Sequence, residues 1–291
     1  ILRITGGEPT IHGSTYRLLD EINKNPMPNL ELNINSNLGA NPKVFDRFIS
    51  KLKPIIEEKK VREFKLFTSI DTWDKDKAEY MRNGLDIELF KRNFDKYLSE
   101  IKDSKLSLMI TFNNLCVSNF DSLLEQILVW RKKYNDKNAK DRGNINQEIP
   151  LQRIQMDTPY LKEPPHYDMN ILPKKDFTHH MNRHLEFMIN FQDDEDNTKF
   201  KTLEVEKFRR VVDYFKSAKL DNNYIDKGRS DFYNFFTEHD KRRGTDFLKA
   251  FPEYEKFYYD CRRGSTKTQR AIRLEQRRAE MLRRKQNDKV D

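Results

Sequence analysis

The sequence predicts an α/β fold built on parallel strands. Strand-like and helix-like segments alternate through roughly the first 173 residues, and such alternation implies parallel strands joined by right-handed crossovers. Short polar clusters follow the predicted strands, and the functional loops of such folds lie at the carboxyl ends of the strands. A barrel or open barrel is favoured over a flat doubly wound sheet, although periodicity alone does not choose between them.

Five segments have the pattern of strands. The segment LELNIN at 30–35 alternates apolar and polar residues, which is the period of a half-buried strand. The predicted strands cover residues 1–5, 30–35, 61–69, 106–112 and 151–156.

Helical patterns fill the intervals between these strands. Asn41 followed by Pro42 is a typical helix start, and Asp86 is an N-cap residue before another apolar stripe. The stripes repeat every three or four residues, as on one face of a helix; they include Tyr16, Leu19 and Ile22, then Phe45, Phe48 and Leu52, then Phe90, Phe94 and Tyr97, then Phe120, Leu123 and Ile127.

After about Pro173 the pattern changes to helices rich in charged and aromatic residues. We predict three regions: a core at 1–173, a helical extension at 174–261 and a basic tail at 262–291, which is either helical or disordered. Within the extension, helices are expected at 175–191, 203–218, 229–238 and 245–259. The simplest reading of the segment around 235–258 is a helical cap closed by an Asp240–Arg243 ion pair.

The positive charge of the chain is concentrated in the tail. Residues 262–291 hold 11 Lys and Arg against 4 Asp and Glu, whereas the rest holds 44 basic and 43 acidic residues. The tail is therefore the candidate site for an anionic partner such as RNA, DNA or an acidic peptide, and a solvated, partly disordered terminus is the competing interpretation. The tail lacks the aromatic residues on which single-stranded bases stack.

Two cysteines, Cys116 and Cys261, do not form a disulfide framework, which suits a reducing cytosol, and a cytoplasmic location is expected. No apolar stretch approaches the roughly 18–20 residues of a membrane span, so no membrane partner is expected.

The first predicted strand ends in the turn GGEP, residues 6–9. Glycines let the backbone approach a ligand closely because no Cβ is present, and proline ends the strand and stiffens the turn. The carboxylate of Glu8 and the free carbonyls of the turn suit a small cationic group. For an isolated motif, a strand–turn–helix connection with a surface glutamate is the competing interpretation.

The motif ITGGEPT, followed by NSN and SID at the ends of the next two strands, resembles the radical S-adenosylmethionine (radical SAM) superfamily. The resemblance covers residues 1 to about 173, and the C-terminal part is similar to a group with a twitch-type extension. It implies a partial (β/α)6 TIM-like barrel that lacks its first strand here, with a C-terminal helical extension.

The resemblance also implies roles for individual residues in SAM binding. Gly6, Gly7 and Glu8 would hold the methionine ammonium, with Pro9 shaping the turn. Ser36 and Asn37 match a polar pair near the methionine or ribose. Ser69 matches a serine that contacts the carboxylate or ribose.

Three further positions follow from the same comparison. Asp71 would face the substrate or the cofactor, Arg82 would pair with the SAM carboxylate, and Asn113 or Asn114 would line the ribose side. Each also has a structural interpretation: Asp71 as a helix cap, Arg82 in a salt bridge, and the asparagines as loop caps.

The CxxxCxxC motif that ligates the [4Fe–4S] cluster of this superfamily is absent from the sequence. The simplest explanation is that the first strand and the cluster loop lie upstream of Ile1. The expected cofactors are therefore SAM and a [4Fe–4S] cluster whose ligands lie outside this fragment. The fragment alone is expected to be inactive, and the complete enzyme to need an electron donor such as flavodoxin or ferredoxin.

Other functions remain open at this point. The chain could be a non-catalytic adaptor that binds nucleic acid or peptide on the same barrel, or a barrel lyase with Glu8 as base, although no catalytic lysine or metal set accompanies Glu8. His180 and His184 share a helix spacing seen in zinc sites but lack a third ligand. The substrate is not identified; peptide, nucleotide, RNA and small molecules are all compatible.

Overall fold

The computed structural model describes residues 1–134 and 152–264. The chain forms two compact units. Unit 1 consists of residues 1–160 and 179–214, and unit 2 of residues 161–178 and 215–291. The sequence places 179–214 in the extension, whereas their contacts group them with the sheet. The predicted basic tail lies outside the described residues from 265 onward.

Unit 1 contains a parallel sheet of five strands in the order β1-β2-β3-β4-β5. The α/β class with parallel strands is confirmed, and each predicted strand is present in the described part. Their bounds are β1 Leu2–Ile4, β2 Met27–Asn35, β3 Val61–Ser69, β4 Lys105–Met109 and β5 Ile154–Asp157.

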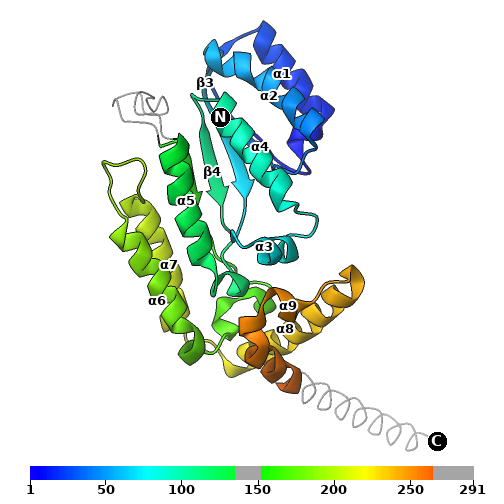
Figure 1. The fold of residues 1–291 in the computed structure, drawn as a ribbon, viewed down its shortest axis with the longest axis vertical. Coiled ribbons are helices and arrows are strands. Elements are labelled where there is room, and N and C mark those ends of the chain that lie inside the picture. Colours follow the sequence, from blue (N-terminus) through cyan, green and yellow to red (C-terminus); the bar gives the residue numbers. More distant parts are fainter. Residues whose placement is uncertain (135–151, 265–291) are drawn as a thin grey trace, which may run out of the picture. The chain divides into compact units, whose positions relative to one another are not determined.

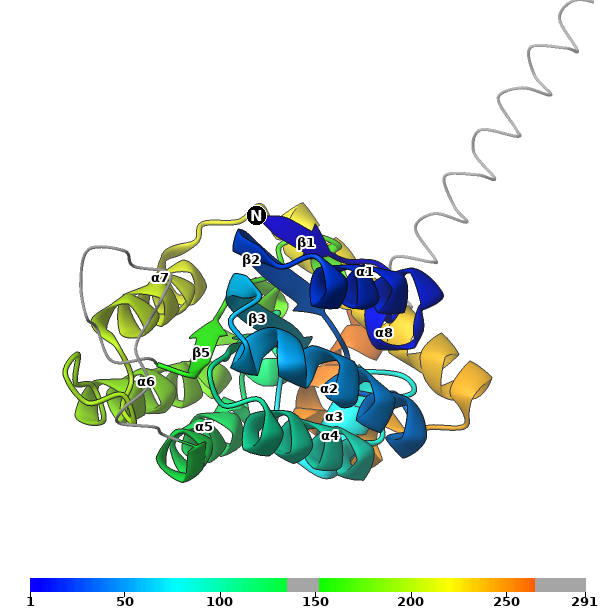
Figure 2. The ribbon, with the colours of Figure 1, turned by 90° about the horizontal axis from the view of Figure 1, so that it is seen from above.

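Helices connect successive strands and cover one face of the sheet. Figure 2 shows α1, α2, α4 and α5 along the same side of the strands, as right-handed crossovers require when each adds the next strand in one direction. The bounds are α1 Gly13–Lys24, α2 Pro42–Glu57, α3 Lys75–Met81, α4 Ile87–Glu100 and α5 Phe120–Tyr134.

Two of the predicted helix starts are confirmed by their hydrogen bonds. The Asn41 side chain accepts from the backbone amide of Val44 at the start of α2, with Pro42 in the first turn. The Asp86 carboxylate accepts from the amides of Glu88 and Leu89 at the start of α4. Each cap satisfies amides that the first helical turn leaves without a partner.

The two faces of the sheet differ in polarity. In a parallel sheet, residues paired across strands share a face, and the register places a continuous apolar set against the helices. This set comprises Leu32 and Ile34 of β2, Phe64 and Leu66 of β3, Leu106 and Leu108 of β4, and Ile154 and Met156 of β5, all 5% exposed or less.

The opposite face is polar and half-buried. Lys65 pairs in register with Lys105, and Lys105 forms an ion pair of 2.9 Å with Glu63. Asn35 accepts a hydrogen bond from Arg3, whose guanidinium lies 4.3 Å from the centre of the Phe67 ring. This face therefore holds charged side chains that are partly removed from water, and such groups need ion-pair or hydrogen-bond partners.

The edge strand β5 is closed by side chains of unit 1. Glu204 belongs to α7 (Thr202–Ser217) and accepts from the amide of Met156. Arg131 donates to the carbonyl of Ile154 and to Glu204, over 2.6 Å in the latter case. The buried backbone groups at this edge of the sheet thereby have hydrogen-bond partners. Helix α6, Lys174–Asn190, lies beside α7 in Figures 1 and 2.

Unit 2 is mainly helical. Its longest helix, α8 (Asn222–Arg243), approaches the turn η3 (Pro165–Tyr167) at Gly228, where a Cβ would lie 2.7 Å from the Ile171 side chain and 3.1 Å from the carbonyl of Pro165. Only glycine permits this approach. The remaining elements are η4 Met169–Ile171, α9 Phe247–Ala250, η5 Pro252–Tyr254 and helical residues 255–264.

Helix α8 is longer than the predicted 229–238, and the predicted Asp240–Arg243 ion pair is wrong. The Asp240 carboxylate instead accepts from the amide of Phe247, at 2.8 Å, and from the Thr245 hydroxyl, at 2.7 Å. It thus fixes the connection to α9 after Gly244, which ends α8 at a φ of 65°. The guanidinium of Arg243 lies 3.1 Å from the ring of His239.

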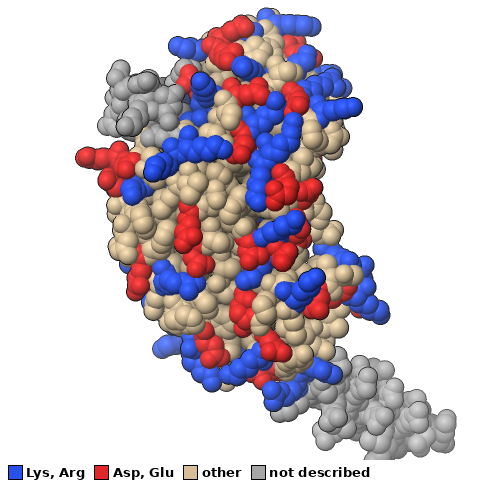
Figure 3. Space-filling view, viewed as in Figure 1, with Lys and Arg blue, Asp and Glu red and all other residues tan. Residues whose placement is uncertain are grey.

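Charges of both signs are interspersed on the face that Figure 3 shows, as the near-neutral composition outside the tail predicts. None of the helices in the described part is both long enough and apolar enough to span a membrane.

Candidate functional site at the carboxyl edge of the sheet

The turn after β1 has a backbone that favours glycine. Gly6 has a φ of +89° and Gly7 a φ of +57°, which side chains rarely adopt. Both residues are exposed, and a Cβ at either would meet nothing within 4 Å. The glycines are therefore required by the backbone angle of the turn, and the space above the turn is open.

Glu8 points back onto the rim and not away from it. One carboxylate oxygen accepts from the amide of Thr10, at 3.1 Å, and from its hydroxyl, at 2.5 Å. The other accepts from the amide of Asn37, at 2.7 Å. Glu8 also caps the short helix η1 (Pro9–Ile11), in which Pro9 is buried at the first position. A carboxylate offers about four acceptor sites, so one remains for a further donor.

The loop after β2 is the partner of this turn. The amide of Ser36 donates to the carbonyl of Phe67 in β3, and the Ser36 hydroxyl accepts from the amide of Leu38. The Asn37 side chain accepts from the amide of Gly39, at 2.7 Å. Ser36 is 6% exposed, and Asn37 is exposed. Both side chains shape their own loop, and of the two only Asn37 reaches solvent.

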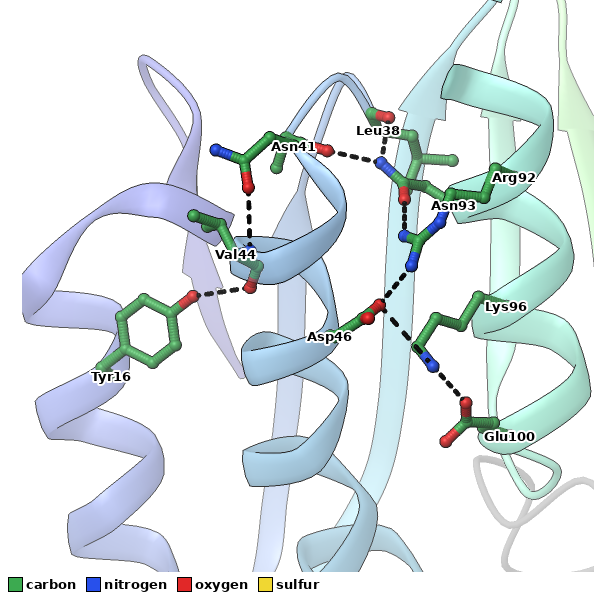
Figure 4. Close-up of polar contacts among 10 residues, drawn as sticks. Tyr16, Leu38, Asn41, Val44, Asp46, Arg92, Asn93, Lys96 and Glu100 are labelled. Carbon is green, nitrogen blue, oxygen red and sulfur yellow. Dashed lines mark hydrogen bonds and ion pairs between the residues drawn. The ribbon is translucent and has the colours of Figure 1, made fainter. Parts of the chain in front are cut away.

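Asn93 holds this loop from below and was not among the residues singled out in the sequence. Its side-chain amide donates to the carbonyls of Leu38 and Ala40, each over 2.8 Å, and the residue is fully buried. Figure 4 shows it reaching the loop from α4. The detectable signal was a polar residue between Phe90 and Tyr97 on the apolar stripe of a helix.

Figure 4 also shows how this position is locked. Arg92 donates to the Asn93 side chain, at 2.7 Å, and to Asp46 of α2, at 2.6 Å. Lys96 lies 3.6 Å from the same Asp46 carboxylate and 2.5 Å from Glu100. The hydrogen bond from Arg92 fixes the amide orientation of Asn93, so that its NH₂ group faces the loop.

Ser69 is the last residue of β3 and is half-buried. Side chains alternate between the two faces along a strand, so Ser69 lies on the same face as Lys65, which is the polar face of the sheet. Its hydroxyl forms no hydrogen bond with another residue of the described ranges. The Ser69 hydroxyl is therefore available to a ligand.

Asp71 and Arg82 are paired with each other. One oxygen of Asp71 accepts from two nitrogens of Arg82, at 2.8 and 2.7 Å, and the other accepts from the amide of Thr111, at 2.9 Å. Burial raises the pKa of Asp71 above its usual value, against the opposing effects of Arg82 and Thr111. The hydrogen bond from Thr111 to Asp71 ties the loop after β3 to the loop after β4. The remaining terminal nitrogen of Arg82 has no partner in the described part.

Asn113 acts within its own loop. Its side chain accepts from the amide of Leu115 and donates to the carbonyl of Thr111, which caps the turn η2 (Asn114–Cys116). Asn113 is 6% exposed and Asn114 is fully buried. Both asparagines therefore lie inside the loop, where a cofactor would have little of their surface to contact.

A chain of contacts joins the four strand-end loops. Glu8 binds Asn37, the neighbouring Ser36 binds the end of β3, and Asp71 binds Thr111 after β4. The structure thus brings the predicted residues to one edge, in two groups. The first is Gly6, Gly7, Glu8, Pro9, Ser36 and Asn37; the second is Asp71, Arg82 and Asn113, with Ser69 between them in sequence.

The cysteines and histidines of the described part do not form a metal centre. Burial raises the pKa of Cys116, which is fully buried, and that of Cys261 to about 12. His184 lies in the core, where one ring nitrogen is 2.9 Å from the carbonyl of Val117, and burial lowers its pKa to about 4. No group of three His, Cys, Asp or Glu suited to a metal occurs among the described residues.

No model of a known protein family matches the chain, and neither a curated protein nor a solved structure is significantly similar to it.

Proposed function

We propose that this chain is the SAM-binding core of a radical SAM enzyme. The observation that carries the proposal is the position of Glu8: a half-buried carboxylate at the carboxyl edge of a parallel sheet, held beside two exposed glycines of positive φ and hydrogen-bonded to the next strand loop. Its remaining acceptor site and the carbonyls of the turn suit an ammonium group.

The residues present fit SAM at three further points. The Ser69 hydroxyl, which has no partner among the described residues, suits a ribose hydroxyl or a carboxylate. The remaining terminal nitrogen of Arg82 suits the carboxylate of the methionine moiety. Asn37 reaches solvent beside Glu8 and suits polar contact with the same ligand. The contacts among the loops hold these groups in place before a ligand arrives, which lowers the ordering cost of binding.

A [4Fe–4S] cluster does not fit the residues present. Cluster ligands are thiolates, and Cys116 and Cys261 are buried thiols whose pKa values are raised. If the reaction uses such a cluster, its ligands would have to be residues other than these two cysteines, and the chemistry that the cluster would supply is reductive cleavage of SAM. The part that we assign to this chain is to bind and orient SAM and to keep water from the loop interior.

Under this proposal the five-stranded sheet is part of a barrel of the (β/α)6 type. All crossovers add strands in one direction, as in barrels and unlike the reversal at the switch point of doubly wound sheets. At the β1 edge, Ile1 is 88% exposed and Leu2 38% exposed, although Leu2 pairs with the buried Leu32. A strand docked there would cover both side chains, and the polar face would become the barrel interior.

The proposal is tested by SAM binding to the chain itself, measured by calorimetry. Glu8→Ala should weaken binding at least about tenfold, because hydrogen bonds to charged groups contribute about 1.5–3 kcal/mol. The exposed Glu125 serves as the matched control, and Glu125→Ala should bind SAM as the wild type does. Equal affinities for the two variants would refute the role of Glu8.

A second assay tests the chemistry. The full-length protein would be reconstituted without oxygen and given a reductant, and 5′-deoxyadenosine would be measured for the wild type and Glu8→Ala. Formation that depends on Glu8 supports the enzyme. SAM binding with no cleavage, or no binding at all, supports the adaptor on the same fold.

A further inference from the structure

Unit 2 contains a cavity of about 730 Å³ that lies entirely within that unit, between α8 and the turn η3. Gly228 permits the close approach of these two elements at one end. The residues that define its chemistry are His166, Lys227, Asp231, Phe235, Arg242 and Arg243. No role in the strand-end site is assigned to any of them.

The cavity is elongated. Its lining extends along α8 from Lys227 to Arg243, and at 1.5 Å of rise per residue this distance is about 24 Å. A single amino acid or mononucleotide would fill only part of such a length. The shape suits an extended chain of several units.

Aromatic rings occupy the middle of the cavity. The rings of His166 and Phe235 are stacked, with centroids 4.5 Å apart and an angle of 26° between the planes. Phe235 is 38% exposed, so part of its surface is open to a ligand. Burial lowers the pKa of His166, which keeps the imidazole uncharged near neutral pH. An exposed aromatic ring beside a neutral one offers a stacking surface for a flat base.

Cationic groups lie at both ends. Lys227 stands at one end, and Arg242 and Arg243 stand at the other. Within the described residues, neither Lys227 nor Arg243 forms an ion pair, whereas Arg242 is bound to Glu238 at 2.6 Å. The unpaired cations suit two phosphates separated by stacked bases. Asp231, a carboxylate inside the cavity, suits a base amino group or a ribose hydroxyl.

We propose that this cavity binds a short stretch of single-stranded nucleic acid, with a base stacked on Phe235 and His166 and phosphates at Lys227 and Arg243. Cations that follow the backbone and aromatic rings that stack bases are the two components of single-strand recognition. This inference goes beyond the proposed function and does not depend on SAM chemistry. It also supplies the aromatic contact that the basic tail lacks.

The test uses the full chain and labelled oligouridylate or oligothymidylate of roughly ten nucleotides, within the usual site sizes, with binding measured by fluorescence anisotropy. Phe235→Leu keeps an apolar side chain but removes the ring, and should lower affinity about 5- to 100-fold. Tyr259→Leu is the matched control, because Tyr259 is 41% exposed in the same unit but does not line the cavity. The basic tail is identical in both variants.

The charged ends are tested through the salt dependence of the same binding. The double variant Lys227→Gln and Arg243→Gln should reduce the slope of log affinity against log salt by about 1.4, since each single-strand phosphate contact contributes about 0.7. Lys219→Gln with Lys249→Gln is the control pair outside the cavity. Phe235→Leu should leave the slope unchanged, which separates stacking from charge.

Three results would overturn the proposal. The first is equal affinity for Phe235→Leu and Tyr259→Leu. The second is an unchanged slope in the Lys227 and Arg243 variant. The third is displacement of the oligonucleotide by oligoglutamate of equal charge as effectively as by unlabelled oligonucleotide, which would show a site for acidic peptides. Tighter binding of the uridylate identifies RNA as the ligand, and tighter binding of the thymidylate identifies DNA. Equal unfolding midpoints of the variants show that the fold is retained.

Discussion

The carboxylate of Glu8 accepts a hydrogen bond from the backbone amide of Asn37 over 2.7 Å, which joins the loops after β1 and β2. The same carboxylate binds Thr10 through its other oxygen. Glu8 therefore stabilises the rim as well as offering an acceptor to a ligand. The two roles make different predictions, because stability is measured without a ligand.

Replacement of Glu8 should loosen the rim. Glu8→Ala removes a cap and the contact to Asn37, and should lower the free energy of unfolding by about 1–2 kcal/mol. Glu8→Gln keeps one acceptor and should cost less. Denaturant unfolding measures both, and hydrogen exchange at the Asn37 amide should accelerate in the alanine variant. If exchange there matches that of the Glu125→Ala control, the contact does not form in solution.

Asn93 should control the loop after β2. Asn93→Asp keeps the shape and the contact to Arg92 but removes both donors to Leu38 and Ala40. Since the carbonyls lose their partner in a buried site, the variant should be destabilised by about 2–4 kcal/mol. SAM affinity should also fall, because the loop positions Asn37.

The control for Asn93→Asp is the same change at Asn41, an exposed helix cap for which aspartate is an equally good residue. Asn41→Asp should alter stability by a few tenths of a kcal/mol at most. A similar, small effect at both positions would mean that Asn93 does not hold the loop.

The Asp71–Arg82 pair predicts that the loss of stability caused by Arg82→Gln depends on pH. A carboxyl whose pKa is raised in the folded protein binds its proton more tightly there, so its contribution to stability is greatest below its unfolded pKa and falls as the pH rises through the folded pKa. Arg82→Gln removes the main opposing charge and should raise that pKa further. The loss of unfolding free energy caused by Arg82→Gln should therefore be small in acid and grow with pH, toward about 3 kcal/mol.

Urea unfolding at a series of pH values measures this cost, and the double variant Asp71→Asn with Arg82→Gln provides the comparison. In the double variant the dependence on pH should largely disappear, because no ionisable group remains at this position. A cost of Arg82→Gln that is the same at every pH would contradict the pairing.

His184 should destabilise the protein in mild acid. Its pKa is about 4 in the fold, against an ordinary value of 6.5, so between these values the unfolded chain binds a proton that the folded chain does not. The contribution to stability is complete above about pH 6.5 and is lost as the pH falls, by roughly 3 kcal/mol in total. Asp121, Arg183 and His180 are the charged and titratable groups that act on it.

The measurement is the slope of unfolding free energy against pH in this window. His184→Leu should flatten the slope relative to the wild type, whereas His179→Gln, an exposed histidine on the same helix, should leave it unchanged. Identical slopes for wild type and His184→Leu would show that another group is responsible.

The sequence by itself determined the α/β class, the five strands and the two capped helix starts, because alternation, helical stripes and cap residues are local signals. It also indicated which loops meet at one edge, since parallel strands align their carboxyl ends. Strand ends were less accurate: the segment expected to reach Phe112 ends at Met109, and Phe112 instead bridges to Tyr160. The long helix α8 was underestimated because its polar first turns carry a weak apolar stripe.

Only the tertiary structure decided how the side chains are used. Whether Asp71 faces a ligand or Arg82 depends on a loop closure that no local pattern encodes, and the same holds for Asn93, whose partners lie more than 50 positions away. The predicted ion pair of Asp240 and Arg243 does not form, because the Asp240 carboxylate accepts from a backbone amide after the helix end instead. Local composition fixes which groups are available, and packing selects their partners.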